Sequence, residues 1–301
     1  MIKELNGGII GATSRAVKYG NLKYKIVCAL LDYIGYSNHS IHDLEVRNKV
    51  YRYVEKKYHY VVSKFENDMP DSGTESHDVW ICWFQGMENA PSIVKKCYNS
   101  ILKWMPNMNI HVLDRKNLFE YITLPPFIIE KWEKGIISDT LFSDFVRLSV
   151  LIKYGGIWID STVYMTGPLP MYIKKSQFFM YQSNEYDNSK LGESWFIKAN
   201  AGNRILQLTL SLMNEYWRRE NKMRDYFIMF ICMKIASNKY ANDLAKMPKI
   251  PSAVPILMQK YLLEEVDEQL YNELFKISPI HKLTYKLKNT GNKNILLNKL
   301  A

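Results

Sequence analysis

The segment ISDTLFSDFVRLSVLIKYGGIWIDSTVYMTGP, residues 137–168, joins three different signals. Its first half has apolar residues at helical spacing and carries Asp144 and Arg147, which three positions bring to neighbouring parts of one helix face. The pair Gly155-Gly156 ends this helix, because glycine accepts the left-handed backbone common at helix ends. The apolar triplet IWI then forms a buried strand ending at Asp160. Ligands of open α/β sheets bind beyond the carboxyl ends of strands, so a polar site is predicted at Asp160.

Length and composition indicate a folded, non-membrane-spanning protein. The chain has 301 residues, 47% of them hydrophobic, which is enough for a large core. Its four cysteines form no CxxC pair, so we expect free thiols in a reducing cytoplasm rather than a zinc site or disulfides. The sequence contains neither a signal-peptide pattern nor a run of about 18 apolar residues that could span a membrane.

The net charge of +10 is concentrated at the two ends of the chain. A nucleic-acid-binding protein should carry its basic residues on the working domain, so we expect no nucleic-acid partner. Basic ends around a neutral centre fit an anionic membrane surface, and equally well an ordinary solvated surplus of charge.

The order of apolar patterns predicts an α/β domain behind a helical extension. Helices are expected over 14–34 and 41–65, and core packing of their apolar faces is favoured over lipid binding. A linker over 66–77 precedes a strand, a helix and a strand over 79–84, 91–105 and 109–113, which form a βαβ unit. Further strands are expected over 177–181 and 195–199, and helices over 125–132, 203–220, 224–237 and 254–274. The predicted units are a basic helical extension (1–76), the main domain (77–288) and a basic tail (289–301).

Three motifs in this order resemble one known family. They are VWICWFQG (79–86), SDFVRLSVLIKYGGIWIDST (143–162) and SPIHKLTYK (278–286). They are similar to the signatures of the capsular polysaccharide synthesis glycosyltransferases, which are related to glycosyltransferase family 32. The resemblance covers about residues 77–288.

The resemblance implies a GT-A-type fold, a Rossmann-like mixed sheet flanked by helices, with a D-x-D element that holds a divalent metal against a UDP-sugar. The residues that would contact the donor are Trp80, Trp83, Gln85, Asp144, Arg147, Gly155, Gly156, Asp160, Ser161, Thr162 and Lys282. One of the two tryptophans is expected in the core instead.

The metal site departs from the family pattern, because Thr162 stands where a second acid is usual. Asp160 alone is a weak metal site, and His281 is the candidate that would complete it. An imidazole ligand would favour Mn²⁺ over Mg²⁺. A structural role for His281 is equally consistent with the sequence.

Two further residues are weaker candidates for catalysis. Asp225 could be an acid near the anomeric carbon or the acceptor, although an acid in the first turn of a helix also satisfies the helix dipole. Asn200, with Trp195 in the preceding strand, resembles the segment that shapes the sugar and acceptor side. Family 32 relatives retain anomeric configuration, and the resemblance implies retention here.

The leading hypothesis is a cytoplasmic glycosyltransferase, peripheral at the inner face of the membrane. It would move galactose or glucose from a UDP-sugar to a lipid-linked saccharide in surface polysaccharide synthesis. Two alternatives remain: a sugar-phosphate transferase of polysaccharide assembly, and a non-catalytic protein that binds membranes or nucleic acid.

Overall fold

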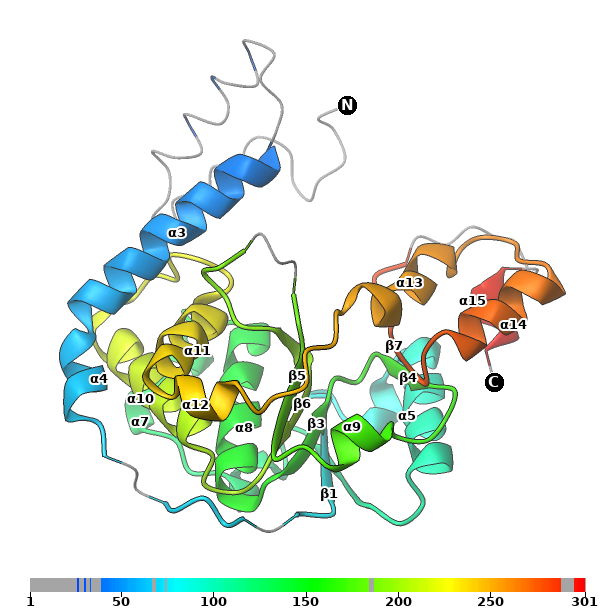
Figure 1. Ribbon diagram of the computed structural model, residues 1–301, viewed down its shortest axis with the longest axis horizontal. Helices are drawn as coiled ribbons and strands as arrows, with labels where there is room; N and C mark the ends of the chain where they lie inside the picture. The colour runs from blue at the N-terminus through cyan, green and yellow to red at the C-terminus, as the bar shows by residue number, and fades with distance from the viewer. Residues whose placement is uncertain are drawn as a thin grey trace.

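A five-stranded mixed sheet crosses the centre of the computed structural model (Figure 1), in the order β2-β1-β3-β6-β5. The structure describes residues 39–66, 69–73, 75–183, 187–287 and 295–300, with the single positions 26, 30 and 33. The strands are β1 (Asp78–Cys82), β2 (Asn109–Leu113), β3 (Gly156–Ile159), β5 (Phe178–Tyr181) and β6 (Glu193–Ala199). β1 is parallel to β2 and β3, whereas β6 is antiparallel to β3 and β5. The predicted α/β class and βαβ unit are confirmed.

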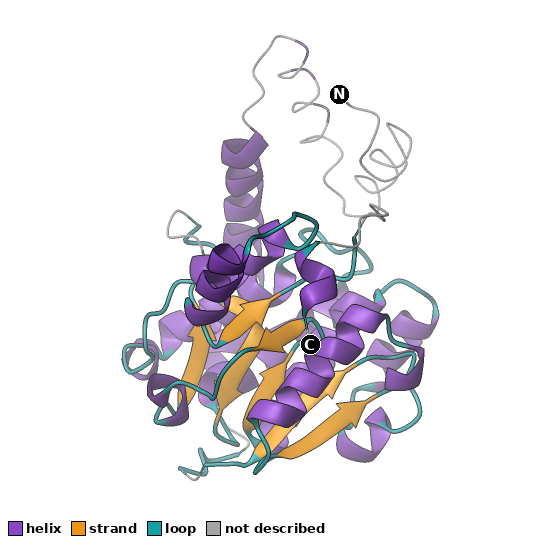
Figure 2. Ribbon diagram, turned by 90° about the vertical axis from the view of Figure 1, so that its right-hand side faces the viewer, coloured by secondary structure: helices purple, strands orange, loops and turns teal. Residues whose placement is uncertain are grey.

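Helices cover both faces of this sheet, as the turned view in Figure 2 shows. One face packs on α8 (Asp139–Tyr154), α10 (Arg204–Arg219) and α11 (Ile228–Lys239), and the other on α5 (Ser92–Trp104) and α9 (Met171–Lys174). The side chains of β1 alternate between these two faces. Trp80 packs in the core on the α8 side, whereas Val79 and Ile81 pack in the core on the α5 side. The near-continuous apolar run over 79–84 therefore supplies buried side chains to both faces of the sheet, as its sequence predicts. Short helices in the connections are η1 (Met87–Asn89), α6 (Leu118–Tyr121), α7 (Pro126–Glu133) and α12 (Ala241–Leu244).

A smaller unit lies beside the α5 face, to the right in Figure 1. It contains the antiparallel pair β4 (Val163–Met165) and β7 (Ile280–Lys282), with α13 (Ala253–Tyr261), α14 (Glu268–Lys276) and α15 (Leu296–Lys299). The predicted single helix over 254–274 is wrong. The helix α13 ends at Tyr261. α14 begins after Asp267, whose side chain caps it by accepting a hydrogen bond from the Leu270 N–H (2.7 Å).

The N-terminal helices pack against α10 and α11. α3 (His39–Lys57) and α4 (His59–Lys64) replace the one helix predicted over 41–65, because the chain breaks helical geometry at Tyr58 (φ −109°, ψ 16°). Val54 and Tyr58 are fully buried in the same core as Trp80. The predicted core packing is thus confirmed for these helices. The helix predicted over 14–34 lies outside the described residues except at three positions.

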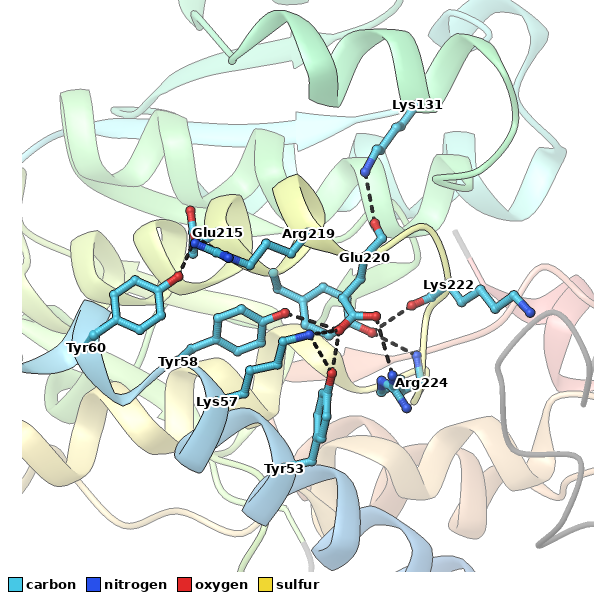
Figure 3. A network of polar contacts seen from close by, with 11 residues as sticks. Tyr53, Lys57, Tyr58, Tyr60, Lys131, Glu215, Arg219, Glu220, Lys222 and Arg224 are labelled. Carbon is cyan, nitrogen blue, oxygen red and sulfur yellow. Dashed lines mark hydrogen bonds and ion pairs between the residues drawn. The ribbon is translucent and has the colours of Figure 1, made fainter.

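A polar network fixes these helices to the end of α10 (Figure 3). Glu220 accepts hydrogen bonds from Tyr53 (2.5 Å) and Lys57 (2.5 Å), and lies 3.5 Å from the Arg224 guanidinium. Tyr60 donates in the same way to Glu215 on α10. Among the described helices, none is both long and apolar enough to cross a membrane.

Candidate functional site

A pocket of about 610 Å³ opens at the carboxyl ends of β1 and β3. Its walls come from the segment after β1, the first half of α8, the segment from β3 to β4, and the residues after β7. The side chains that line it are Cys82, Trp83, Phe84, Gln85, Asp139, Thr140, Ser143, Arg147, Trp158, Asp160, Ser161, Thr162, Tyr226, Gln259, Lys282, Leu283, Thr284, Tyr285 and Lys286. The polar site predicted from residues 137–168 therefore lies at the expected edge of the sheet.

Arg147 organises the floor of this pocket. Its helix α8 begins at Ser138, whose side chain accepts from the Leu141 N–H. Arg147 Nη1 lies 3.1 Å from Asp144 Oδ1 and donates to the Ser194 carbonyl oxygen at 3.4 Å. The guanidinium also lies 5.0 Å from the centre of the Trp158 ring, in cation–π geometry. These contacts hold the planar guanidinium in one orientation, with Nη2 3.4 Å from both Ser143 Oγ and Asp160 Oδ1.

The pair Gly155-Gly156 forms the sharp turn between the end of α8 and the start of β3. Gly155 and Gly156 have φ of 69° and 93°, a backbone region that favours glycine. A Cβ on Gly156 would lie 2.1 Å from the Asp78 carbonyl oxygen, because β3 runs directly beside β1 at this point. Neither glycine lines the pocket. They were predicted to contact the donor, whereas the structure gives them the sharp turn that delivers β3 to its place.

Asp160 is the carboxylate at the end of β3. Its N–H donates to the Trp195 carbonyl oxygen (2.9 Å), and its Oδ1 accepts from the Trp158 indole (2.9 Å). Arg147 Nη2 lies 3.4 Å from Oδ1, and Lys282 Nζ lies 3.3 Å from Oδ2. Two cations from distant parts of the chain therefore share one carboxylate.

Lys282 reaches this position because β7 pairs with β4. Val163 lies opposite Lys282 in the register, and the Leu283 N–H donates to the Thr162 carbonyl oxygen (2.8 Å). Lys282 Nζ also donates to Thr162 Oγ1. The threonine that replaces the expected second acid thus positions an ammonium group.

The two acids of the site titrate differently. Burial raises the pKa of Asp144 from 3.8 to about 7, despite the opposing charge of Arg147. Burial acts in the same direction on Asp160, but Lys282 and Arg147, with the Trp158 hydrogen bond, hold its pKa below the usual value. Despite the same burial, the two pKa values thus shift in opposite directions, because Asp160 has two cationic neighbours and an indole donor while Asp144 has Arg147 alone.

The two tryptophans after the linker have different places. Trp80 is 1% exposed, donates to the Gly155 carbonyl oxygen (2.9 Å) and stacks on His111, so it belongs to the core and not to the pocket. Trp83 lines the pocket and meets Tyr285 edge to face, with ring centres 5.3 Å apart. Its indole N–H is buried and has no hydrogen-bond acceptor among the described residues. Gln85 lines the same wall.

His281 does not join Asp160, and this corrects the predicted pair of metal ligands. Neighbouring residues of a strand point to opposite faces, so the Lys282 contact to Asp160 turns His281 away from the pocket. Its Nε2 lies 3.1 Å from Thr166 Oγ1, and burial lowers its pKa to about 4. Within the described residues, no three His, Cys, Asp or Glu side chains are grouped to hold a metal ion.

Asn200, Trp195 and Asp225 do not line the pocket. Asn200 follows β6, which runs antiparallel to β3, so it lies at the opposite edge of the sheet from Asp160. Trp195 is buried and stacks on Tyr181 at 4.7 Å. Asp225 accepts from the Phe227 N–H (2.8 Å) and lies 3.7 Å from Arg47 Nε, which favours its structural role.

Sequence reasoning missed several residues that line the pocket. Tyr285 and Lys286 line the pocket and belong to the C-terminal motif SPIHKLTYK, of which the sequence analysis names only His281 and Lys282 as candidates. Ser143 could have been found from its spacing, since it precedes Arg147 by one helical turn and its Oγ lies 3.4 Å from Nη2. Tyr226 and Gln259 carry no comparable signal in the sequence.

Comparisons with known proteins agree with the motifs. Residues 32–300 match the profile of a family described as capsular polysaccharide synthesis protein. The O-glycosyltransferase braB of Annulohypoxylon truncatum is 31% identical over 100 residues, covering 29% of this chain and 23% of that protein. The glycosyltransferase afumC of Aspergillus fumigatus is 22% identical over 112 residues, covering 33% of this chain and 28% of that protein. The chain thus spans about a quarter of the length of these curated relatives.

A solved structure titled PaToxG Glycosyltransferase aligns with 86% of this chain and 95% of its own. The TM-score is 0.37 and the sequence identity 14%.

Proposed function

The chain belongs to the capsular polysaccharide synthesis protein family, and from this premise we propose that it is a glycosyltransferase that takes a hexose from a UDP-sugar. The acceptor we propose is a lipid-linked saccharide at an anionic membrane surface, and the hexose is galactose or glucose. The family description and the two relatives named as glycosyltransferases support the reaction class.

The observation that carries this proposal is the contact of Arg147 and Lys282 with Asp160 in the pocket. Glycosyl transfer from a nucleotide sugar releases a nucleoside diphosphate, whose negative charge grows as the bond to the sugar breaks. Cations fixed in advance at that position stabilise the transition state more than the bound donor. A pocket of about 610 Å³ is also within the usual range for a ligand of this size.

We propose transfer with retention through a short-lived ion pair. The described pocket lining has two acidic side chains, Asp139 and Asp160, and each is engaged by a cation. Arg115 lies 2.7 Å from Asp139, and the step we propose uses neither carboxylate as a nucleophile. The departing phosphate would then accept the proton of the incoming hydroxyl.

The test uses the purified full chain with a panel of UDP-sugars and a saccharide acceptor. Release of UDP and the mass of the product are measured for the wild type and for Arg147→Lys. Loss of the guanidinium fork should lower kcat/KM by about 10²-fold, the usual effect of removing one transition-state donor. The exposed Arg218→Lys on α10 is the matched control and should leave kcat/KM unchanged.

Three results would contradict the proposal. A product carrying a phosphate would indicate the sugar-phosphate transferase instead. Absence of both donor binding and UDP release, in protein whose fold is verified by circular dichroism, would exclude a transferase for these donors. Equal activities of Arg147→Lys and Arg218→Lys would remove Arg147 from the site.

A further inference from the structure

The residues around Asp160 do not fit the divalent-cation site that the family resemblance implies. A hard cation such as Mg²⁺ or Mn²⁺ needs several oxygen or imidazole ligands, usually with more than one carboxylate. The other acids near Asp160 are already paired among the described residues, Asp139 with Arg115 (2.7 Å) and Asp144 with Arg147 (3.1 Å). Thr162 Oγ1 already accepts from Lys282, and no three His, Cys, Asp or Glu side chains of the described residues are grouped to hold a metal ion. His281, the residue predicted as a further ligand, is buried on the opposite face of β7.

Positive charge is already present at the same place. Lys282 Nζ lies 3.3 Å from Asp160 Oδ2, and Arg147 Nη2 lies 3.4 Å from Oδ1. Both distances are long for charge-assisted hydrogen bonds, which are usually about 2.7–2.9 Å. Among the described residues Lys282 Nζ donates to Asp160 Oδ2 and Thr162 Oγ1, which leaves one of its three N–H groups for another acceptor. The Lys282 side chain is 21% exposed and lines the pocket.

We propose that Lys282 replaces the divalent metal in this protein. Together with Arg147 it binds the diphosphate of the donor, and the reaction proceeds without a metal ion. The inference rests on the proposed glycosyltransferase function and names how that site holds its donor.

The group-transfer step is balanced with these residues alone. The bond from the anomeric carbon to the β-phosphate oxygen breaks, and its electron pair stays on the phosphate beside Lys282 and Arg147. A bond from the acceptor oxygen to the anomeric carbon forms, and the acceptor proton passes to the departing phosphate. Lys282 takes no part in the proton transfer, because its role is that of a fixed positive charge.

The experiment measures binding of UDP and UMP by isothermal titration calorimetry in EDTA, in Mn²⁺ and in Mg²⁺. The proteins are the wild type, Lys282→Met, Lys282→Arg and the control Lys103→Met, an exposed lysine on α5. Wild-type affinity for UDP should change less than about 3-fold between EDTA and Mn²⁺. Lys282→Met should weaken UDP at least 10-fold and UMP much less, because the lost contact is to the second phosphate. Lys282→Arg should restore most of the affinity, and the control should match the wild type.

The possible failures are distinguishable. Wild-type binding that collapses in EDTA and returns with Mn²⁺ would overturn the metal replacement and leave the glycosyltransferase proposal standing. Unchanged UDP affinity in folded Lys282→Met would overturn the role of Lys282. If Lys282→Met fails to fold, the wild-type comparison between EDTA and Mn²⁺ still decides whether binding needs a metal, and the UDP affinity of Lys282→Arg tests the role of Lys282. Absence of UDP binding in every condition would overturn the proposed donor and this inference with it.

Discussion

Arg147 is the residue on which the geometry of the site depends. An exposed ion pair three positions apart on a helix would contribute only a few tenths of a kcal/mol. Here the guanidinium is about 5% exposed and serves both Asp144 and Asp160. Removing one partner of such a buried group leaves an uncompensated charge, which typically costs about 3–5 kcal/mol. Burial costs the Arg147 guanidinium its hydration. The contacts that compensate for this loss also hold the cation in one orientation beside the pocket.

Asp144 should make the stability of the protein depend on pH. Its pKa is raised by burial to about 7, so between its unfolded value of 3.8 and about 7 the folded state binds more protons than the unfolded state. The free energy of unfolding should therefore fall as pH rises through this window. Asp144→Asn cannot titrate and should flatten the slope. Urea unfolding of both proteins from pH 4 to pH 8 checks this. Parallel curves would show that Asp144 is ionised in the folded state throughout.

Asp160 and its neighbours show how far sequence reasoning can go at this scale. The position of Asp160 follows from local patterns, since a helix, two glycines and an apolar triplet fix the end of a strand. The choice between His281 and Lys282 does not, because it depends on the register between β4 and β7. β4 has only three residues, Val163–Met165, which is too short for a period-two pattern to be recognised. A one-residue change of register would exchange the two side chains.

At the scale of elements, long periodic segments were predictable and interruptions were not. The bounds of β2 were predicted without error, and α5 and α7 within one or two residues. The break at Tyr58 was missed because tyrosine is compatible with a helix, and its burial against α10 is what favours the turn. The break after Tyr261 was missed for a similar reason, since the segment keeps apolar residues such as Leu262 and Val266 that pack in the smaller core.

The junction of α8 and β3 gives a prediction for a pair of glycines. Gly156→Ala should destabilise the protein by more than about 3 kcal/mol, because it adds a close contact with the Asp78 carbonyl oxygen to an unfavourable φ. Gly135→Ala is the matched control: its φ is 68°, but no atom lies within 4 Å of the added Cβ. It should cost only about 1–2 kcal/mol. Urea unfolding measures both. Equal losses would mean that backbone conformation, and not the approach of β1, makes Gly156 necessary.

At the scale of the whole molecule, the N-terminal helices and the sheet share one core. Val54 and Tyr58 belong to the same buried cluster as Trp80, and Glu220 ties Tyr53 and Lys57 to the end of α10 (Figure 3). The predicted boundary near residue 76 marks a linker in the sequence. Packing across it favours a single cooperative unit over 39–287, because separating the helices would expose fully buried side chains.

Val54→Ala tests whether the molecule unfolds as one unit. The change removes two buried methyl groups, and at about 0.8 kcal/mol each plus a cavity term it should cost about 2 kcal/mol. Native-state hydrogen exchange is measured for the amides of α3 and of α8. In one cooperative unit, the most protected amides of both helices should lose the same free energy of protection. Val254→Ala on α13, where the side chain is 40% exposed, should change neither by more than about 0.5 kcal/mol. Loss confined to α3 would show instead that the helical extension is a separate domain, as its linker suggests.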